Sequence, residues 1–176
     1  MLNNLPPRPR WNHQCVKEAT ALEFVDSIRD WAESMGVVDE GVDDKEFLAV
    51  LTLALVESPD AYQAGRYLED FIEWPVTGEL FKILEQAFHR MKFVTRDFVH
   101  AWVMENNIRI TAKRGDLIRC KVGDLEITGR LQEVIKREAK GYFIPNGRDQ
   151  HMPVYAEEIL QVLPERKKKP DAPKSA

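Results

Sequence analysis

Residues 115–164 decide the fold of this chain and read GDLIRCKVGDLEITGRLQEVIKREAKGYFIPNGRDQHMPVYAEEILQVLP. Apolar residues alternate with polar ones along much of this stretch, and two turn sequences, Gly123-Asp124 and Asn146-Gly147, interrupt it. Alternation with a period of two is typical of a β-strand with one buried face, and Asn-Gly is a strong hairpin signal. The stretch therefore predicts several short strands joined by turns.

The alternating pattern begins after Asn106-Asn107, so we expect a separate β domain over residues 108–164. We expect five strands in it. Five short strands in about fifty-five residues favour a closed small barrel, because closure removes the unpaired edges that an open sheet would leave.

Four segments of this domain carry a family resemblance. GDLIRCKV, GRLQEVI, GYFIPNGR and PVYAEEILQVLP follow one another within residues 112–164, and this order resembles SH3-like small barrels of the Tudor and KOW kind. In those barrels a glycine precedes the second strand and a short acidic turn precedes the last. The resemblance implies a five-stranded SH3-like β-barrel, a fold that serves protein binding, nucleic-acid binding and purely structural roles.

The residues before this domain show a helical period instead, with apolar residues recurring every three or four positions. Residues that cap helices mark the expected boundaries, and Gly36 is a typical C-terminal cap. The expected helices begin near Asn12, Asp43 or Asp44, Ser58, Thr77 and Thr95. The fold class predicted for the whole chain is therefore α+β, with an N-terminal bundle of about five helices followed by the barrel.

The layout of the whole chain has a second, fainter resemblance. A tryptophan near the start of the helical region, the segment LEQAFHRMKFVTRDF at residues 84–98 and a following small barrel are similar to the β subunit of nitrile hydratases. This resemblance implies a non-catalytic subunit associated with a metalloenzyme. The chain itself contains no cysteine-rich metal-binding loop.

Charge is divided unevenly along the chain. Residues 1–107 contain 10 Lys and Arg against 19 Asp and Glu, a net charge of −9, whereas residues 108–176 contain 15 against 10, a net charge of +5. Part of the positive charge is the run RKKK at residues 166–169. We expect an extended proline-rich arm at residues 1–11, an acidic helical domain at 12–107 and a disordered basic tail at 165–176.

No set of residues forms a signature of catalysis or of metal binding. The four histidines do not pair at the spacing of a helical metal site, and there is no glycine-rich phosphate loop. Cys15 and Cys120 stand in apolar-patterned segments, which favours reduced, packed thiols over a disulfide framework. We expect a cytoplasmic protein that is not an enzyme, with no cofactor, no metal site, no small-molecule substrate and no membrane span.

Protein binding is the leading functional hypothesis, because two modules that commonly bind partners occur without any catalytic signature. The protein would be an adaptor, an accessory subunit or an inhibitor, with the helical domain and the small barrel as binding surfaces. The candidate contact residues are Trp74, Phe93, Trp102 and Tyr155.

Nucleic-acid binding is the alternative. Basic residues are frequent in the β domain, and strand alternation would place several of them on one face, with Tyr142 available for base stacking. The candidate residues are Arg119, Lys121, Arg130, Lys136, Arg137, Tyr142 and Arg148. Acidic residues are interspersed among them, and the acidic helical region would repel phosphate.

Overall fold

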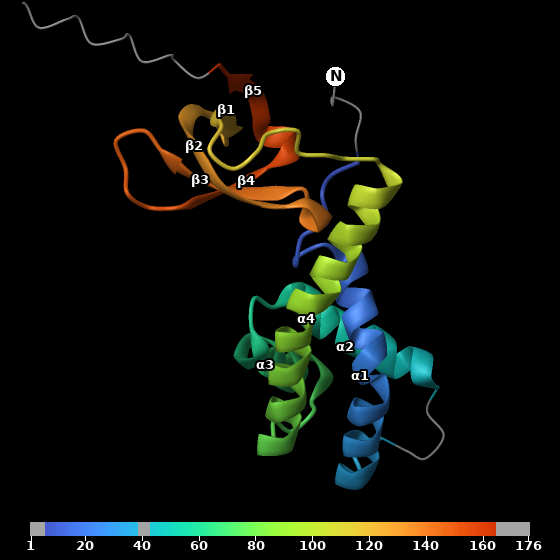
Figure 1. The fold of residues 1–176 in the computed structure, drawn as a ribbon. Coiled ribbons are helices and arrows are strands. Elements are labelled where there is room, and N and C mark those ends of the chain that lie inside the picture. The colour runs from blue at the N-terminus through green and yellow to red at the C-terminus, as the bar shows by residue number, and fades with distance from the viewer. Residues whose placement is uncertain (1–5, 39–42, 165–176) are drawn as a thin grey trace, which may run out of the picture. The chain divides into compact units, whose positions relative to one another are not determined.

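The computed structural model describes residues 6–38 and 43–164 of the chain. They belong to two compact units, one over Pro6–Trp102 and one that begins at Val103 (Figure 1). The predicted basic tail at 165–176 and residues 1–5 of the predicted proline-rich arm lie outside the described residues. The α+β class is confirmed, because the helices come first along the chain and a β-sheet follows them.

The described residues contain four α-helices, α1 (Gln14–Met35), α2 (Asp44–Glu57), α3 (Ala61–Ile72) and α4 (Gly78–Glu105). Two of the predicted boundaries are confirmed. Gly36 ends α1 in the left-handed conformation at φ 63°, and the Asp43 side chain accepts a hydrogen bond from the backbone N–H of Lys45 at the start of α2.

The prediction of five helices was wrong, because α4 runs without a break through both of the last two predicted helices. The residues around Thr95 include no glycine or proline that would end a helix. Thr95 Oγ1 instead donates to the carbonyl of Met91, at 2.7 Å, which is a bond back to the preceding turn of the same helix. Thr95 is therefore an interior residue of α4 and not an N-cap.

The helices of the first unit share one hydrophobic core. α1 packs along α2, and α2 packs on α3. Figure 1 shows α1 and α4 side by side, and Arg90 of α4 donates to both carboxylate oxygens of Glu23 of α1, at 2.6 and 3.1 Å. The core includes Val16, Ile28, Trp31, Leu51, Leu55, Leu68, Leu80, Leu84 and Met91.

Lys17 is a charged side chain inside this unit, with only 3% of its surface exposed. Its Nζ donates to the backbone carbonyls of Leu55 and, at 2.9 Å, of Val56. The last carbonyls of a helix have no donor within the helix, so the ammonium group caps the C-terminus of α2. Burial lowers the pKa of Lys17, and the neighbouring carboxylate of Glu57 partly opposes that effect.

The second unit contains one antiparallel sheet of five strands, in the spatial order β4-β3-β2-β1-β5. The strands are β1 (Leu117–Val122), β2 (Leu125–Ile135), β3 (Lys140–Pro145), β4 (Met152–Tyr155) and β5 (Ile159–Leu163). Short 3₁₀ turns, η1 (Lys136–Glu138) and η2 (Ala156–Glu158), precede β3 and β5. The five predicted strands are therefore present.

The prediction of a closed barrel was wrong, because among the described residues no pairing joins β4 to β5. These two strands are the edges of the sheet. β4 has only four residues, and one of them, Pro153, has no backbone N–H to donate to a further strand. The edge at β4 is thus poorly suited to closing the sheet, and the structure is an open sheet.

The inner face of the sheet holds the core of the second unit, which includes Ile118, Cys120, Leu131, Phe143 and Val154. Gly129 lets β2 approach β3 closely. A Cβ at Gly129 would lie 2.3 Å from the carbonyl oxygen of Ile144 and 2.6 Å from Cδ2 of Phe143. Only glycine is accommodated at this position.

Candidate functional site

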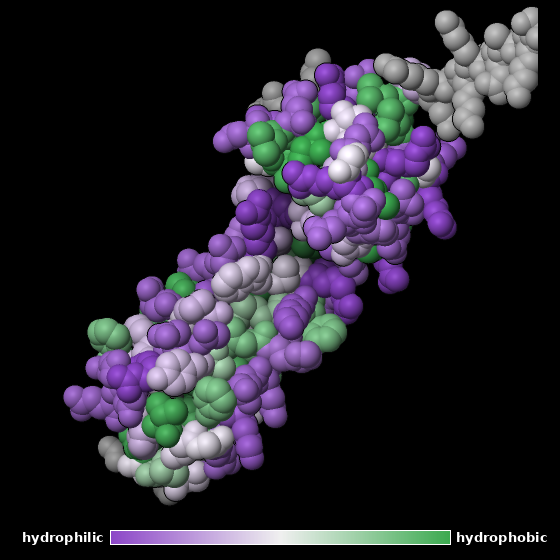
Figure 2. Space-filling view, turned by 90° about the vertical axis from the view of Figure 1, so that its left-hand side faces the viewer, coloured by the Kyte–Doolittle hydropathy of each residue, from purple (hydrophilic) through white to green (hydrophobic). Residues whose placement is uncertain are grey.

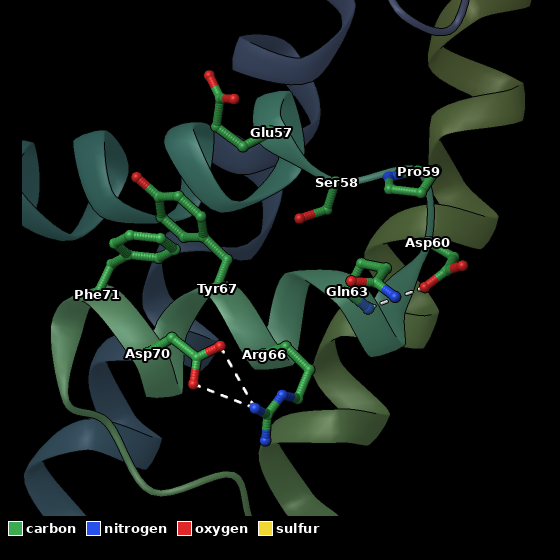
Figure 3. A pocket seen from close by; sticks show the side chains of 9 residues that line it. All are labelled: Glu57, Ser58, Pro59, Asp60, Gln63, Arg66, Tyr67, Asp70 and Phe71. Atoms are coloured by element: carbon green, nitrogen blue, oxygen red, sulfur yellow. Dashed lines mark hydrogen bonds and ion pairs between the residues drawn. The ribbon is translucent and has the colours of Figure 1, made fainter.

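A groove with an aromatic wall and an acidic rim lies along α3 (Figure 3). We call it the α3 groove. It is open to solvent, has a volume of about 440 Å³, and is lined by Glu57, Ser58, Pro59, Asp60, Gln63, Arg66, Tyr67, Asp70 and Phe71. In Figure 3, Tyr67 and Phe71 lie on one side of the hollow and Asp60 and Gln63 on the other.

One end of the groove is the turn between α2 and α3. The sequence predicted a helix that begins near Ser58, but the N-cap of α3 is Asp60, whose carboxylate accepts from the backbone N–H of Gln63 at 2.9 Å. Ser58 is instead buried at the end of α2. The turn therefore holds the Asp60 carboxylate at the edge of the groove.

The aromatic side of the groove follows from the unusual core face of α3. Small residues occupy most of that face, where Ala61, Ala64 and Gly65 are buried together with Leu68. The large aromatic residues of the same helix lie off this buried face. Tyr67 is therefore half-buried, and Phe71 is 72% exposed, with their ring centroids 5.0 Å apart.

Carboxylates outnumber cations around the groove. Glu57, Asp60 and Asp70 line it, and Arg66 is the single basic residue among the lining side chains. Arg66 is already paired, with Glu69 at 2.8 Å and with Asp70 at 3.2 Å. The groove therefore presents an aromatic surface in a negative field, which suits a cationic ligand with an apolar part.

A second hollow adjoins the groove and shares Pro59 and Asp60 with it. We call it the Trp11 pocket. Its volume is about 530 Å³, and its other lining residues are Trp11, Ala61, Glu85, Phe88, His89, Met91 and Lys92. Lys17 Nζ lies 5.6 Å from the centroid of the Trp11 ring. Basic and acidic side chains both line this pocket, so it lacks the charge bias of the α3 groove.

The residues predicted for protein binding do not form one surface. Trp74 is only 7% exposed and packs in the core, with its ring centroid 5.6 Å from that of Trp31 and 6.1 Å from that of Phe47. Trp102 is also 7% exposed, and its ring N–H donates to the carbonyl of Pro6 at 3.0 Å. The burial of these two tryptophans contradicts the exposure that a contact role needs.

The other two residues of that set are accessible but separate. Phe93 of α4 is 37% exposed, and the guanidinium groups of Arg90 and Arg96 lie 5.9 and 5.3 Å from its ring centroid. Tyr155 is half-buried and ends β4 in the second unit. Neither residue lines a pocket described above.

The strand register places part of the predicted nucleic-acid set on one face. Arg119 and Lys121 are exposed on β1 between buried residues, and Arg130 is exposed on β2 opposite Leu117. Residues opposite one another in antiparallel strands share a face, so these three side chains lie on the outer face of the sheet. Arg119 also pairs with Glu126 at 3.7 Å, which reduces the net charge of that face.

The remaining basic candidates are distributed over the second unit. Tyr142 is on the outer face of β3, where Lys140 Nζ lies 4.7 Å from its ring centroid. Lys136 and Arg137 belong to the turn η1, and Arg148 to the connection between β3 and β4. All three are exposed. The structure thus groups Arg119, Lys121 and Arg130 but does not extend them into one basic surface.

Cys120 is buried on β1, and its thiol lies 3.4 Å from the carbonyl oxygen of Ile127. Burial raises the pKa of the Cys120 thiol to about 11, and the carboxylate of Glu158 adds to the rise. A thiol with such a pKa is a poor nucleophile near neutral pH. Its burial on the apolar face of β1 agrees with the sequence prediction.

In the part of the chain that the structure describes, no group of three or more His, Cys, Asp or Glu is arranged to hold a metal ion. The helices within residues 6–38 and 43–164 include none with the length and apolar character needed to cross a membrane.

Sequence reasoning missed the α3 groove, although α3 contains a signal for it. The residues at positions 61, 64, 65 and 68 recur at the core spacing of a helix, and three of these four are Ala or Gly. Tyr62, Tyr67 and Phe71 lie off this stripe, so large aromatic residues on the outer face could have been predicted. The acidic rim could not have been predicted from α3 alone, because one of its carboxylates, that of Glu57, comes from the end of α2.

Compared with known protein families, curated proteins and solved structures, the chain matches none.

Proposed function

We propose that this chain is a non-enzymatic protein-binding protein, and that the α3 groove receives a basic segment of its partner. The observation that carries the proposal is the exposure of Phe71, 72% of whose surface is open to solvent beside the Tyr67 ring. Aromatic side chains in such positions are frequent anchors of protein interfaces. An adaptor, an accessory subunit or an inhibitor would all use such a groove.

Other apolar side chains of the helical unit are also exposed. Tyr62 of α3 is 63% exposed, and Leu53 of α2 is 46% exposed. Figure 2 shows that the hydrophobic side chains on the visible face of the helical unit are interspersed with hydrophilic ones. A partner that extends beyond the groove would bury separate apolar side chains surrounded by polar contacts, which is the usual composition of a non-obligate interface.

The rim determines the charge of the proposed partner. An acidic segment would meet the carboxylates of Glu57, Asp60 and Asp70 with a single, already paired arginine to balance them. A segment with Lys or Arg beside an apolar residue can pair with the rim and place the apolar residue on the Phe71 ring. Charge complementarity of this kind mainly raises the association rate, so binding should weaken as salt increases.

A comparison of three baits tests this proposal. The full chain, its Phe71→Ala variant and its Leu125→Ala variant would be used for affinity capture from the native host, with nuclease present. Leu125 is also highly exposed, at 68%, but it is the first residue of β2 in the second unit. We expect one set of proteins with the wild type and Leu125→Ala that is lost with Phe71→Ala, and that binds in purified form more weakly at higher salt.

Identical recovery with all three baits would contradict the proposal, because the exposed ring would then have no part in binding. Phe71→Ala should fold normally, since the removed side chain is mostly exposed and surface substitutions usually change stability by less than about 0.5 kcal/mol. A circular dichroism spectrum of the variant checks this point.

Nucleic-acid binding is the second candidate, supported by the common face of Arg119, Lys121 and Arg130. Its test is the salt dependence of binding to single-stranded DNA and RNA. If Lys121 and Arg130 each contact a phosphate, replacing either with Ala should lower the slope of log affinity against log salt by about 1. An unchanged slope in both variants would exclude this face as a phosphate-binding surface.

A further inference from the structure

The Trp11 pocket has the composition of a ligand pocket, with buried apolar residues and an exposed polar rim. Ala61 and Met91 are buried, Phe88 is half-buried, and Glu85 and Lys92 are exposed. The volume of about 530 Å³ lies within the range of about 300–1,000 Å³ that is typical of ligand pockets, which are mostly apolar with a few polar groups. A large apolar side chain therefore fits the pocket in both size and chemistry.

Trp11 is the exposed tryptophan of this chain. Its side chain is 49% exposed, whereas each of the other three tryptophans is at most 7% exposed. The residue stands in a turn just before α1, in which the backbone N–H of His13 donates to the carbonyl of Arg10 at 2.9 Å. The ammonium group of Lys17, 5.6 Å from the ring centroid, contacts the ring through a cation–π interaction. Exposed tryptophans that are held in this way are frequent anchors of protein interfaces.

The two hollows differ in charge where they adjoin. Pro59 and Asp60 line both, and the α3 groove on one side of them is acidic. On the other side, the residues that line only the Trp11 pocket include one carboxylate, that of Glu85, and one ammonium group, that of Lys92, whose charges are opposite. Charge complementarity therefore favours a basic side chain in the groove and an uncharged side chain in the pocket.

We propose that the partner's basic segment carries a second anchor, a large apolar side chain that binds in the Trp11 pocket. The basic side chain lies beside Phe71 and Asp70, and the apolar side chain packs against Trp11 and Phe88. The inference rests on the proposed function, because it defines the segment that the α3 groove receives.

A single segment with both anchors has an advantage over two separate ligands. Once one anchor is bound, the other is held near its hollow at an effective concentration in the millimolar range. Two weak contacts then give one stronger and more selective site. A basic segment without the apolar residue should bind more weakly, and an apolar segment without the basic residue should lose its attraction to the acidic groove.

Random dodecapeptides displayed on phage, selected against the full chain, supply the probe for a test. We expect the enriched peptides to share a Lys or Arg and a Phe, Leu or Met at a fixed spacing. A synthetic peptide of that sequence should bind the Trp11→Ala and Phe71→Ala variants about tenfold more weakly than the wild type. Leu22→Ala is the matched control and should bind equally well, because Leu22 is 62% exposed in the same unit but lines neither hollow.

Tryptophan fluorescence shows directly whether the pocket is occupied. Acrylamide quenches exposed indole rings, so in the free protein it reports mainly on Trp11. A bound peptide that contains no tryptophan should lower the quenching to the level of the free Trp11→Phe variant. The same peptide with its apolar residue replaced by Ala should leave the quenching unchanged.

The two variants separate failure of the inference from failure of the proposed function. Peptides that depend on Phe71 but bind Trp11→Ala as well as the wild type, or that leave the quenching unchanged, would overturn the inference alone. Failure to enrich any peptide that depends on Phe71 would overturn both. Circular dichroism checks that Trp11→Ala is folded, and the quenching of the wild type tests the inference without that variant.

Discussion

Lys17 allows a quantitative test of how the helical unit is held together. Its ammonium group is buried and donates to the Leu55 and Val56 carbonyls at the end of α2, so Lys17→Met removes both hydrogen bonds and keeps most of the side-chain volume. Hydrogen bonds from a charged donor contribute about 1.5–3 kcal/mol each, and the substitution also leaves the carbonyls without this donor. The substitution also removes the free-energy cost of burying an ammonium group away from water, and this gain offsets several kcal/mol of the lost hydrogen-bond energy.

We expect Lys17→Met to lower the free energy of unfolding by about 2 kcal/mol as the balance of these terms. Urea unfolding followed by circular dichroism at 222 nm reports mainly on the helical unit. With a slope of about 2 kcal/mol per molar urea, the midpoint should fall by about 1 M. Lys45→Met makes the same chemical change at an exposed lysine of α2 and should shift the free energy by less than about 0.5 kcal/mol.

The lowered pKa of Lys17 adds a dependence on pH with a defined sign. Because burial lowers this pKa in the folded state, the unfolded chain binds more protons between the folded value and the ordinary value of 10.5. The stability of the wild type relative to Lys17→Met should therefore rise with pH through that window. This pH-dependent increment in stability is complete above pH 10.5 and disappears as the pH falls through the folded value, below which the ammonium group still donates its two hydrogen bonds. Equal midpoints for Lys17→Met and Lys45→Met at neutral pH would refute the capping role.

Three further predictions concern other parts of the chain. Gly129→Ala should destabilise the sheet by about 3 kcal/mol in thermal unfolding, because its Cβ would lie 2.3 Å from a backbone oxygen, whereas Gly78→Ala meets no atom within 4 Å and should be neutral. Thr95→Ala should change the unfolding free energy by less than about 0.5 kcal/mol, and a loss of about 1 kcal/mol would indicate the N-cap that the structure lacks. Iodoacetamide at pH 8 should label only the exposed Cys15, and a second adduct on the folded protein would contradict the burial of Cys120 and its raised pKa.

The sequence predicted local features well where one short stretch determines the geometry. Gly36 is a left-handed cap, Asp43 caps α2, and Gly123-Asp124 forms the two-residue turn between β1 and β2. In each case the preference comes from the residue itself or its immediate neighbours. The prediction was wrong at Thr95, because a threonine can either cap a helix or bond back within one, and the local sequence allows both.

The burial of individual side chains was harder to predict. Helix α2 is apolar on nearly every face, a pattern that indicates a buried helix, yet Leu53 and Val56 are 46% and 36% exposed. Trp74 and Trp102 were candidates for a binding surface but are buried. Apolar character shows that a residue can be buried, but the neighbours that cover it come from distant parts of the chain.

By itself, the sequence of this protein determined the α+β class, the order of helices before strands, the five strands and most of the turns, because periodicity and capping act over a few residues. Only the tertiary structure decided that the sheet stays open and that Phe71 is exposed whereas Trp74 and Trp102 are buried. The α3 groove belongs to this second group, since its acidic rim combines the end of α2 with one face of α3. Such a site depends on how helices pack, which no single stretch of sequence specifies.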